Sequence, residues 1–177
     1  MPAKEAKIKG IVIGNKVIVE DSKGANYLYV KGCYGSIIRG RNELSFVEAL
    51  YLFERGLLEI YDGDRKLDFK EIVKIAQEHD HRFWIKYCGY RDIRSRGYIT
   101  KTALKFGADF LVYDRGVRPG EGHSKWALFF VGEEEFFDWK RFAAMMRVAH
   151  GARKKLLIGV VDEEGDVTYY EISWVKP

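Results

Sequence analysis

The segment that most constrains the fold is a nearly continuous apolar run at residues 155–162, KLLIGVVD. A strand with one face in water alternates apolar and polar side chains, whereas a strand buried on both faces is apolar almost throughout. The run therefore predicts a strand inside a sheet that other elements cover on both sides. With 177 residues, the chain is long enough for one large domain or two small ones.

Helices and strands alternate around this run through the second half of the chain. Strands are expected at residues 109–114, 125–131, 155–162 and 167–176, and helices at residues 100–106 and 138–153. The segment 116–122 contains one proline and three glycines, which predicts a loop. This pattern indicates an α/β (α+β) fold class.

The first half has its own signals. Residues 8–13 and 17–20 are short apolar runs around Gly14-Asn15, which is typical of a β-hairpin. Residues 26–31 are expected to form a further strand, followed by a glycine-rich connection at 32–40.

Two helices in the first half are marked by capping boxes. In a capping box, the side chain three residues after the capping residue accepts a hydrogen bond from the backbone N–H of the capping residue. Ser45 with Glu48 begins one helix, and Asp68 with Glu71 begins the other. An aromatic and basic helix is expected within residues 79–97. We place a domain boundary in its first part, with an N-terminal α/β domain at 1–84 and a C-terminal domain at 85–177.

Composition narrows the function only slightly. A net charge of +4 and a pI of about 8.9 permit binding to a polyanion without arguing for it. Two distant cysteines without metal-site spacing predict free thiols, and exposure or packing is favoured over a metal site for His79 and His81. No apolar leader and no membrane-length apolar stretch occur, so we expect a soluble, cytoplasmic protein. The sequence also contains no P-loop, no GxGxxG that opens a helix and no HExxH motif, so we expect no metal and no cofactor.

The loop with the most unusual composition begins after the strand that ends near Tyr113, and this loop runs to His123. Its glycines allow a ligand to approach the backbone, and Arg115 and Arg118 can meet phosphates. A plain hairpin loop with a surface histidine explains the same residues, and composition alone favours that explanation.

A basic run, RVAHGARKK, spans the end of the long helix and the start of the buried strand. It contains Arg147, Arg153, Lys154 and Lys155, which together can form a basic face. Considered alone, Lys154 is better explained as an exposed cation that interacts favourably with the helix dipole.

Taken in order, several segments resemble the archaeal tRNA splicing endonucleases. They are GYIT at 97–100, KFGADF at 105–110, LVYD at 111–114, PGEGHS at 119–124, and RVAH at 147–150 before RKK at 153–155. The match covers about the last 80 residues, and the first half shares only its general pattern. The resemblance implies two small mixed domains, with the catalytic one a mixed β-sheet flanked by helices.

The resemblance also implies an activity. Enzymes of this family cleave precursor tRNA at intron boundaries within a bulge–helix–bulge, without metal, leaving a 2′,3′-cyclic phosphate and a 5′-hydroxyl. Their catalytic tyrosine, histidine and lysine correspond to Tyr113, His123 and Lys154, with Lys155 as the alternative lysine. Histidine is suited to general acid catalysis and lysine to stabilising a charged phosphorane. Arg147 matches one arginine of the family's base clamp, but residues 156–177 contain no arginine to match the second.

A single copy of each domain is similar to the homotetrameric class of this family. The expected last strand places Tyr170, Ile172 and Trp174 on one face, which indicates assembly or, equally, packing within the chain. An acidic turn contains Asp162, Glu163, Glu164 and Asp166. In the family such a turn docks into a basic cleft of a neighbouring subunit, and without the resemblance a solvated hairpin is preferred.

Three functions therefore stay open at this point. The leading hypothesis is a splicing endonuclease acting on precursor tRNA as a homotetramer. The alternatives are a subunit that needs a different partner chain and a non-catalytic RNA-binding module.

Overall fold

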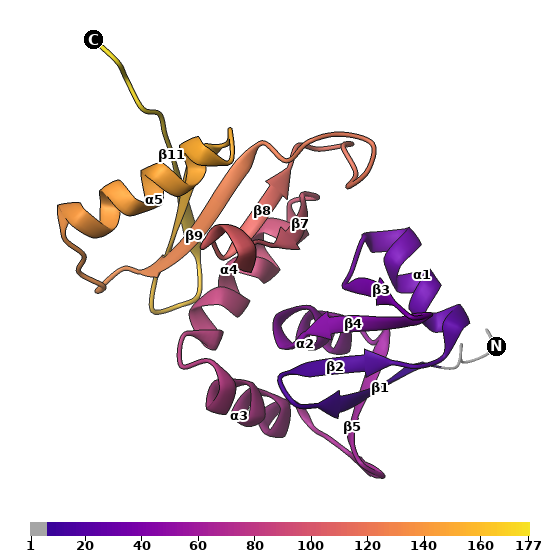
Figure 1. Cartoon of the computed structure of the whole chain (residues 1–177). Helices are drawn as coiled ribbons and strands as arrows, with labels where there is room; N and C mark the ends of the chain where they lie inside the picture. Colours follow the sequence, from indigo (N-terminus) through magenta and orange to yellow (C-terminus); the bar gives the residue numbers. More distant parts are fainter. Residues whose placement is uncertain (1–6) are drawn as a thin grey trace. The chain divides into compact units, whose positions relative to one another are not determined.

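The structure is a computed structural model of the chain that describes residues 7–177. Residues 1–6, with which the expected N-terminal domain begins, lie outside the described part, as does the side chain of Leu104. The chain divides into two compact units, Met1–Trp84 and Ile85–Pro177, each built on its own sheet (Figure 1). The expected class of two mixed α/β domains is confirmed. No helix among residues 7–177 is both long and apolar enough to cross a membrane.

The N-terminal unit contains a six-stranded sheet in the order β3-β4-β2-β1-β5-β6. Its elements are β1 (Ile8–Ile13), β2 (Lys16–Val19), α1 (Ser22–Gly32), β3 (Ser36–Ile38), β4 (Arg41–Ser45), α2 (Phe46–Glu54), β5 (Leu58–Asp62), β6 (Arg65–Lys66) and α3 (Phe69–His79). The predicted hairpin is confirmed, because β1 and β2 pair antiparallel around Gly14, which has a φ of 60°. The connection expected at 32–40 contains the short edge strand β3.

Both capping boxes are present. Ser45 and Glu48 cap α2, and Asp68 and Glu71 cap α3, with the reciprocal side-chain and backbone hydrogen bonds in each case. His79, at the end of α3, stacks on the ring of Phe46 at 5.8 Å, which is a packing contact.

The strand expected at 26–31 is wrong, because these residues belong to helix α1. The side chain of Asp21 caps the helix by accepting a hydrogen bond from the backbone of Gly24. The buried residues Gly24, Ala25 and Leu28 form one helical face, whereas the aromatic and β-branched residues around them favour a strand locally. Packing of that face outweighs local propensity here.

The C-terminal unit contains a five-stranded sheet in the order β11-β10-β9-β8-β7. Its elements are α4 (Phe83–Ser95), which begins in the preceding unit, then β7 (Ile99–Thr102), the 3-10 turn η1 (Leu104–Phe106), β8 (Phe110–Tyr113), β9 (Trp126–Gly132), α5 (Trp139–Gly151), β10 (Lys155–Val161) and β11 (Val167–Ile172). Strands β9 and β10 pair in parallel, and the other neighbours pair antiparallel. The apolar run that predicted a buried strand is β10, whose residues 156–159 and 161 are buried.

Two expectations for this unit are wrong: the type of one element and the end of another. The helix expected at 100–106 is mostly strand β7, since its β-branched residues pair antiparallel with β8, and only Leu104–Phe106 forms a helical turn. The last strand ends at Ile172 rather than near residue 176, so Trp174 lies beyond β11 and its ring contacts that of His150 at 4.6 Å.

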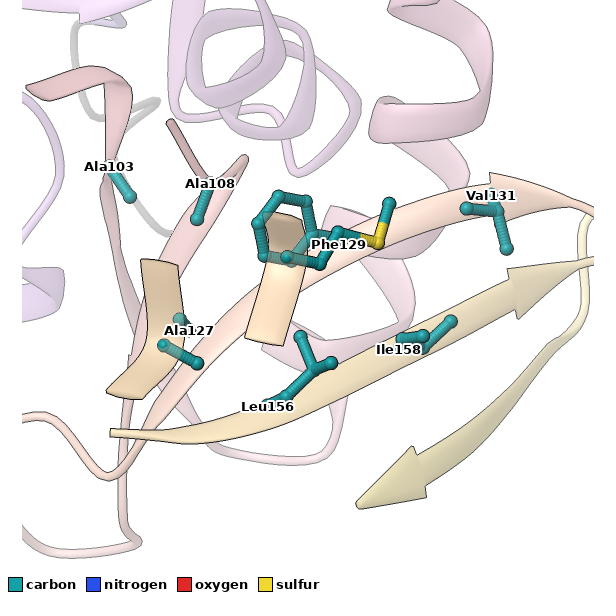
Figure 2. Packing of buried hydrophobic residues seen from close by; sticks show 9 residues of the cluster. Ala103, Ala108, Ala127, Phe129, Val131, Leu156 and Ile158 are labelled. Atoms are coloured by element: carbon teal, nitrogen blue, oxygen red, sulfur yellow. The ribbon is translucent and has the colours of Figure 1, made fainter. Parts of the chain in front are cut away.

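The two faces of the C-terminal sheet are covered by α5 and α4. On the α5 face, a buried cluster joins Met145 and Ala149 of the helix to alternate residues of β9 and β10. Figure 2 shows Ala127 and Phe129 of β9 in this cluster, together with Leu156 and Ile158 of the neighbouring strand β10. Successive residues of a strand point to opposite faces, so Phe130 points toward α4.

Phe130 lies fully buried between two glycines. A Cβ atom at Gly89 of α4 would lie 2.1 Å from the ring of Phe130, and one at Gly159 of β10 would lie 2.7 Å from it. Both positions therefore need glycine because the backbone approaches the aromatic ring closely.

We predict that Gly89→Ala destabilises the protein by about 1–3 kcal/mol, because the methyl group cannot fit without moving Phe130. Chemical denaturation measures this change. The matched control is Gly151→Ala at the end of α5, where a Cβ meets nothing within 4 Å. There the higher helix propensity of alanine should raise stability by about 0.5–1 kcal/mol. Equal effects at the two positions would contradict the packing argument.

Candidate functional site

Three strand ends meet at one edge of the C-terminal sheet. Strand β8 arrives at this edge with Tyr113, whereas the parallel strands β9 and β10 both leave from it. Two backbone hydrogen bonds fix the row: the Lys125 N–H donates to Val112 at 2.8 Å, and the Lys155 N–H donates to Lys125 at 3.0 Å. The ends of β8, β9 and β10 are therefore held side by side.

This row brings the three predicted catalytic residues to the same edge. Tyr113 is the last residue of β8, His123 precedes the start of β9 by three residues, and Lys154 directly precedes β10. In the sheet register Val112 and Lys155 both lie opposite Trp126, so one strand separates Tyr113 from Lys154. Two strand spacings correspond to about 10 Å between their backbones.

The alternation of side chains distinguishes Lys154 from Lys155. Leu111 and Leu156 pack in the cluster on the α5 face. Side chains two positions apart along a strand point to the same face, so Tyr113 and Lys154 also lie on the α5 face. Lys155 lies on the opposite face. Its amine forms an ion pair with Glu171 of β11 at 2.7 Å.

Glu171 holds Lys155 in place through a second partner. The indole N–H of Trp126 donates to the other carboxylate oxygen of Glu171 at 2.7 Å. The hydrogen bond from Lys155, followed by that from Trp126, lowers the pKa of the Glu171 carboxyl below its usual value. Lys155 therefore has a structural partner in its own sheet.

Lys154 is positioned by the end of helix α5. Arg153 adopts a left-handed conformation with a φ of 55°. Its N–H donates to His150 at 2.9 Å, and the Lys154 N–H donates to Ala149 at 2.8 Å. This pair of bonds is the Schellman motif, which satisfies the last carbonyl groups of a helix. Within residues 7–177, the half-buried Lys154 side chain makes no hydrogen bond or ion pair.

A basic groove of about 780 Å³ opens beside Lys154. It is lined by Ser124, Lys125, His150, Gly151, Arg153, Lys154 and Lys155. No carboxylate is among these described lining residues, so the groove suits an anionic ligand. The exposed His123 directly precedes Ser124, and its imidazole makes no hydrogen bond to a described residue.

The sequence did not single out Lys125, which lies in the row between Tyr113 and Lys154. Its amine lies 3.3 Å from Asp114, so its charge is partly balanced. The Arg115 backbone N–H, together with Lys125, holds the pKa of the Asp114 carboxyl below its usual value. The available signal was the position of Lys125 directly before a strand that follows a glycine-rich loop.

The three predicted RNA-binding arginines lie around this edge in different settings. Arg115 is exposed and its guanidinium lies 4.9 Å from the ring centre of Tyr98, which in turn contacts Trp126. Arg118 is half-buried within the loop. Arg147 is exposed on α5, one turn before the groove residue His150, so both residues lie on the same side of the helix.

The acidic turn lies at the opposite edge of the same sheet, where β10 ends and β11 begins. The expected turn is confirmed, since the Gly165 N–H donates to Asp162 at 3.1 Å and the Asp162 N–H donates to Asp166 at 3.0 Å. Glu163 and Glu164 are exposed at its tip. The turn and the basic groove are therefore separated by the length of the strands.

The residues expected to share an apolar face on the last strand are only partly together. Tyr170 and Ile172 both lie on the α5 face of β11, where Ile172 packs against the buried cluster and Tyr170 is 55% exposed. Trp174 is outside the strand. Among the described residues, no group of three or more His, Cys, Asp or Glu side chains could hold a metal ion.

Both domains of this chain are similar to domains of a known protein family. Residues 83–169 match the model for the tRNA intron endonuclease catalytic C-terminal domain, and residues 8–73 match that family's N-terminal domain.

Curated relatives match over most of their lengths. A tRNA-splicing endonuclease of Thermococcus onnurineus is 44% identical over 163 residues, which cover 92% of this chain and 94% of that protein. One from Nanoarchaeum equitans is 42% identical, with 95% and 99% covered, and one from Methanothermobacter thermautotrophicus is 37% identical, with 97% and 99% covered. The chain therefore belongs to the tRNA intron endonuclease family, and it contains both the N-terminal domain and the catalytic C-terminal domain of that family.

Proposed function

We propose that this protein is a tRNA-intron lyase that cleaves precursor tRNA at the boundaries of introns within a bulge–helix–bulge. The reaction needs no metal and leaves a 2′,3′-cyclic phosphate and a 5′-hydroxyl. The observation that carries this proposal is the placement of Tyr113, His123 and Lys154 on neighbouring strand ends beside a basic groove. Membership of the tRNA intron endonuclease family supports the substrate class.

The three side chains suit the steps of such a cleavage. Tyr113 accepts the proton of the 2′-hydroxyl, whose oxygen then forms a bond to the adjacent phosphorus. The bond from phosphorus to the 5′-oxygen breaks, and that oxygen takes a proton from His123. Lys154 stabilises the extra negative charge on the phosphorane.

Tyrosine ordinarily has a pKa near 10 and is a weak base at neutral pH. The basic groove helps here, because nearby cations favour the charged phenolate over the neutral phenol. Lys154 extends from the same face of the sheet as Tyr113. Lys125 is nearer in the row but is paired with Asp114, whereas Lys154 makes no ion pair with residues 7–177, so we assign this effect to Lys154.

RNA is held around this site by arginines. Arg147 lies one helical turn from the groove residue His150 and is exposed for stacking on an unpaired base. Arg115, already stacked on Tyr98, and Arg118 lie in the loop between Tyr113 and His123, where they can contact phosphates.

The functional unit in this proposal is a homotetramer. The acidic turn lies at the far edge of its own sheet from the basic groove, so it is available to a basic cleft of a neighbouring copy. Tyr170 and Trp174 expose large aromatic surfaces at the edge strand or just beyond it, and Ile172 anchors that strand. The N-terminal domain supports this assembly.

The activity is tested by incubating the purified protein alone with a bulge–helix–bulge RNA in excess EDTA. We expect cleavage at both boundaries, with cyclic phosphate ends that resist a phosphatase until the ring is opened by acid. The control is His123→Ala, which should lower the cleavage rate by about 100-fold or more while RNA affinity changes little.

Three other outcomes contradict parts of the proposal. Binding without cleavage by the wild-type protein indicates a binding module or a missing partner chain. Cleavage that EDTA abolishes rules out a metal-independent reaction. A loss of RNA affinity in His123→Ala assigns that residue to binding or structure rather than to proton transfer.

Assembly is tested by sedimentation equilibrium of the wild-type protein. We expect the mass of four chains, and a lower mass when Glu163 and Glu164 are both replaced by lysine, because the turn would then repel a basic cleft. A mass near one chain for the wild-type protein at working concentration contradicts the tetramer.

A further inference from the structure

Three non-glycine residues in the described part of the chain have a left-handed backbone: Cys33, Arg39 and Arg153. Arg153 has a φ of 55° at the first position after the cap of α5, where glycine is the usual residue. A side chain at such a position crowds the following carbonyl, which costs free energy that glycine avoids.

The nearby glycine, Gly151, does not occupy the left-handed position. Gly151 occupies the last helical position of α5, and a Cβ there would meet nothing within 4 Å. Glycine inside a helix is unfavourable, and an arginine in the left-handed region is unfavourable as well. Local stability therefore favours arginine at position 151 and glycine at position 153.

No side-chain interaction with residues 7–177 explains an arginine at this position. Arg153 is exposed, and its guanidinium makes no hydrogen bond or ion pair with any of the residues 7–177. Its backbone N–H completes the Schellman motif, but a glycine would donate the same bond. A residue that breaks a local rule without a gain in stability points to a role in function.

The surroundings of Arg153 indicate which role. Arg153 lines the basic groove together with Lys154, Lys125 and Ser124. No carboxylate is among the described residues that line the groove, so an anion from outside the chain can pair with the guanidinium. Arginine presents paired N–H groups that match two oxygens of a phosphate.

We propose that Arg153 binds a phosphodiester of the RNA next to the scissile bond, and that the left-handed conformation is retained because it aims the guanidinium into the groove beside Lys154. The inference rests on the proposed function, since it assigns an RNA contact to the same site. Arg153 is a binding residue in this account, distinct from the proton-transferring and charge-stabilising groups.

Four variants separate the charge of Arg153 from its backbone conformation. Arg153→Gly removes both the charge and the strain, and Arg153→Ala removes the charge but keeps a strained residue. Arg153→Lys keeps the charge. The matched control is Arg39→Gly, because Arg39 also has a left-handed φ, of 51°, and is exposed in the turn between β3 and β4 of the other domain.

We expect both glycine variants to melt at temperatures higher by roughly 2–5 °C. Arg153→Gly and Arg153→Ala should each weaken binding of a bulge–helix–bulge RNA by about ten-fold, as expected for the loss of one charged hydrogen-bonded contact. The slope of log affinity against log salt concentration should become shallower by about 0.7–0.9. Arg153→Lys should keep most of that slope, and Arg39→Gly should bind and cleave as the wild-type protein does.

Two results would overturn the inference. Wild-type affinity and salt dependence in Arg153→Gly would show that the guanidinium contacts no phosphate. Slower cleavage at unchanged affinity and slope would assign Arg153 only to positioning Lys154. A wild-type protein that neither binds nor cleaves this RNA is a separate outcome, since it rejects the proposed function and this inference with it.

Discussion

The parallel pairing of β9 with β10 is the constraint on which the site depends. The other neighbours in the C-terminal sheet are antiparallel, so each of those strands starts at the edge where its predecessor ended. A parallel pair needs a crossover, which α5 provides, and it returns the chain to the edge from which β9 started. The starts of two strands and the end of β8 therefore meet, which brings Tyr113, His123 and Lys154 to one edge although 41 residues separate the first from the last. If β10 ran antiparallel to β9, Lys154 would lie at the far edge.

The same topology separates charge along the catalytic domain. The edge where strands β9 and β10 start carries a groove with several cations, and its described lining residues include no carboxylate, whereas the turn between β10 and β11 presents carboxylates at the other edge. One copy cannot bring its own acidic turn to its own groove, because the strands between them are rigid and paired along their length. Complementary ends on a rigid body favour association between copies, and in the proposed function this arrangement places two sites on one folded RNA.

Local signals in the sequence predicted the elements that local interactions stabilise. The capping boxes at Ser45 and Asp68 mark helix starts through side chains only three residues apart, and both helices are present. Helix α1 was missed because its stabilising contacts are tertiary, through Gly24, Ala25 and Leu28, whereas its neighbouring residues favour a strand. Strand β7 was missed for a similar reason, since its backbone pairs with β8 outside its own local window.

The candidate site also has a part that the sequence indicated and a part that only the structure shows. The resemblance of ordered segments indicated Tyr113, His123 and Lys154, with Lys155 as the less likely lysine. The face of the sheet separates them, and strand parity and the Glu171 ion pair define that face. The places of Lys125 and the left-handed Arg153 at the site depend on register and backbone conformation, which a single sequence does not display.

The most direct test of the lysine assignment is single-turnover cleavage of a bulge–helix–bulge RNA at saturating enzyme by Lys154→Ala and Lys155→Ala. We predict that Lys154→Ala lowers the cleavage rate by about 100- to 1000-fold, as for loss of one transition-state contact, and that Lys155→Ala changes it only a few-fold. Equal losses, or a larger loss in Lys155→Ala, would contradict the role proposed for Lys154.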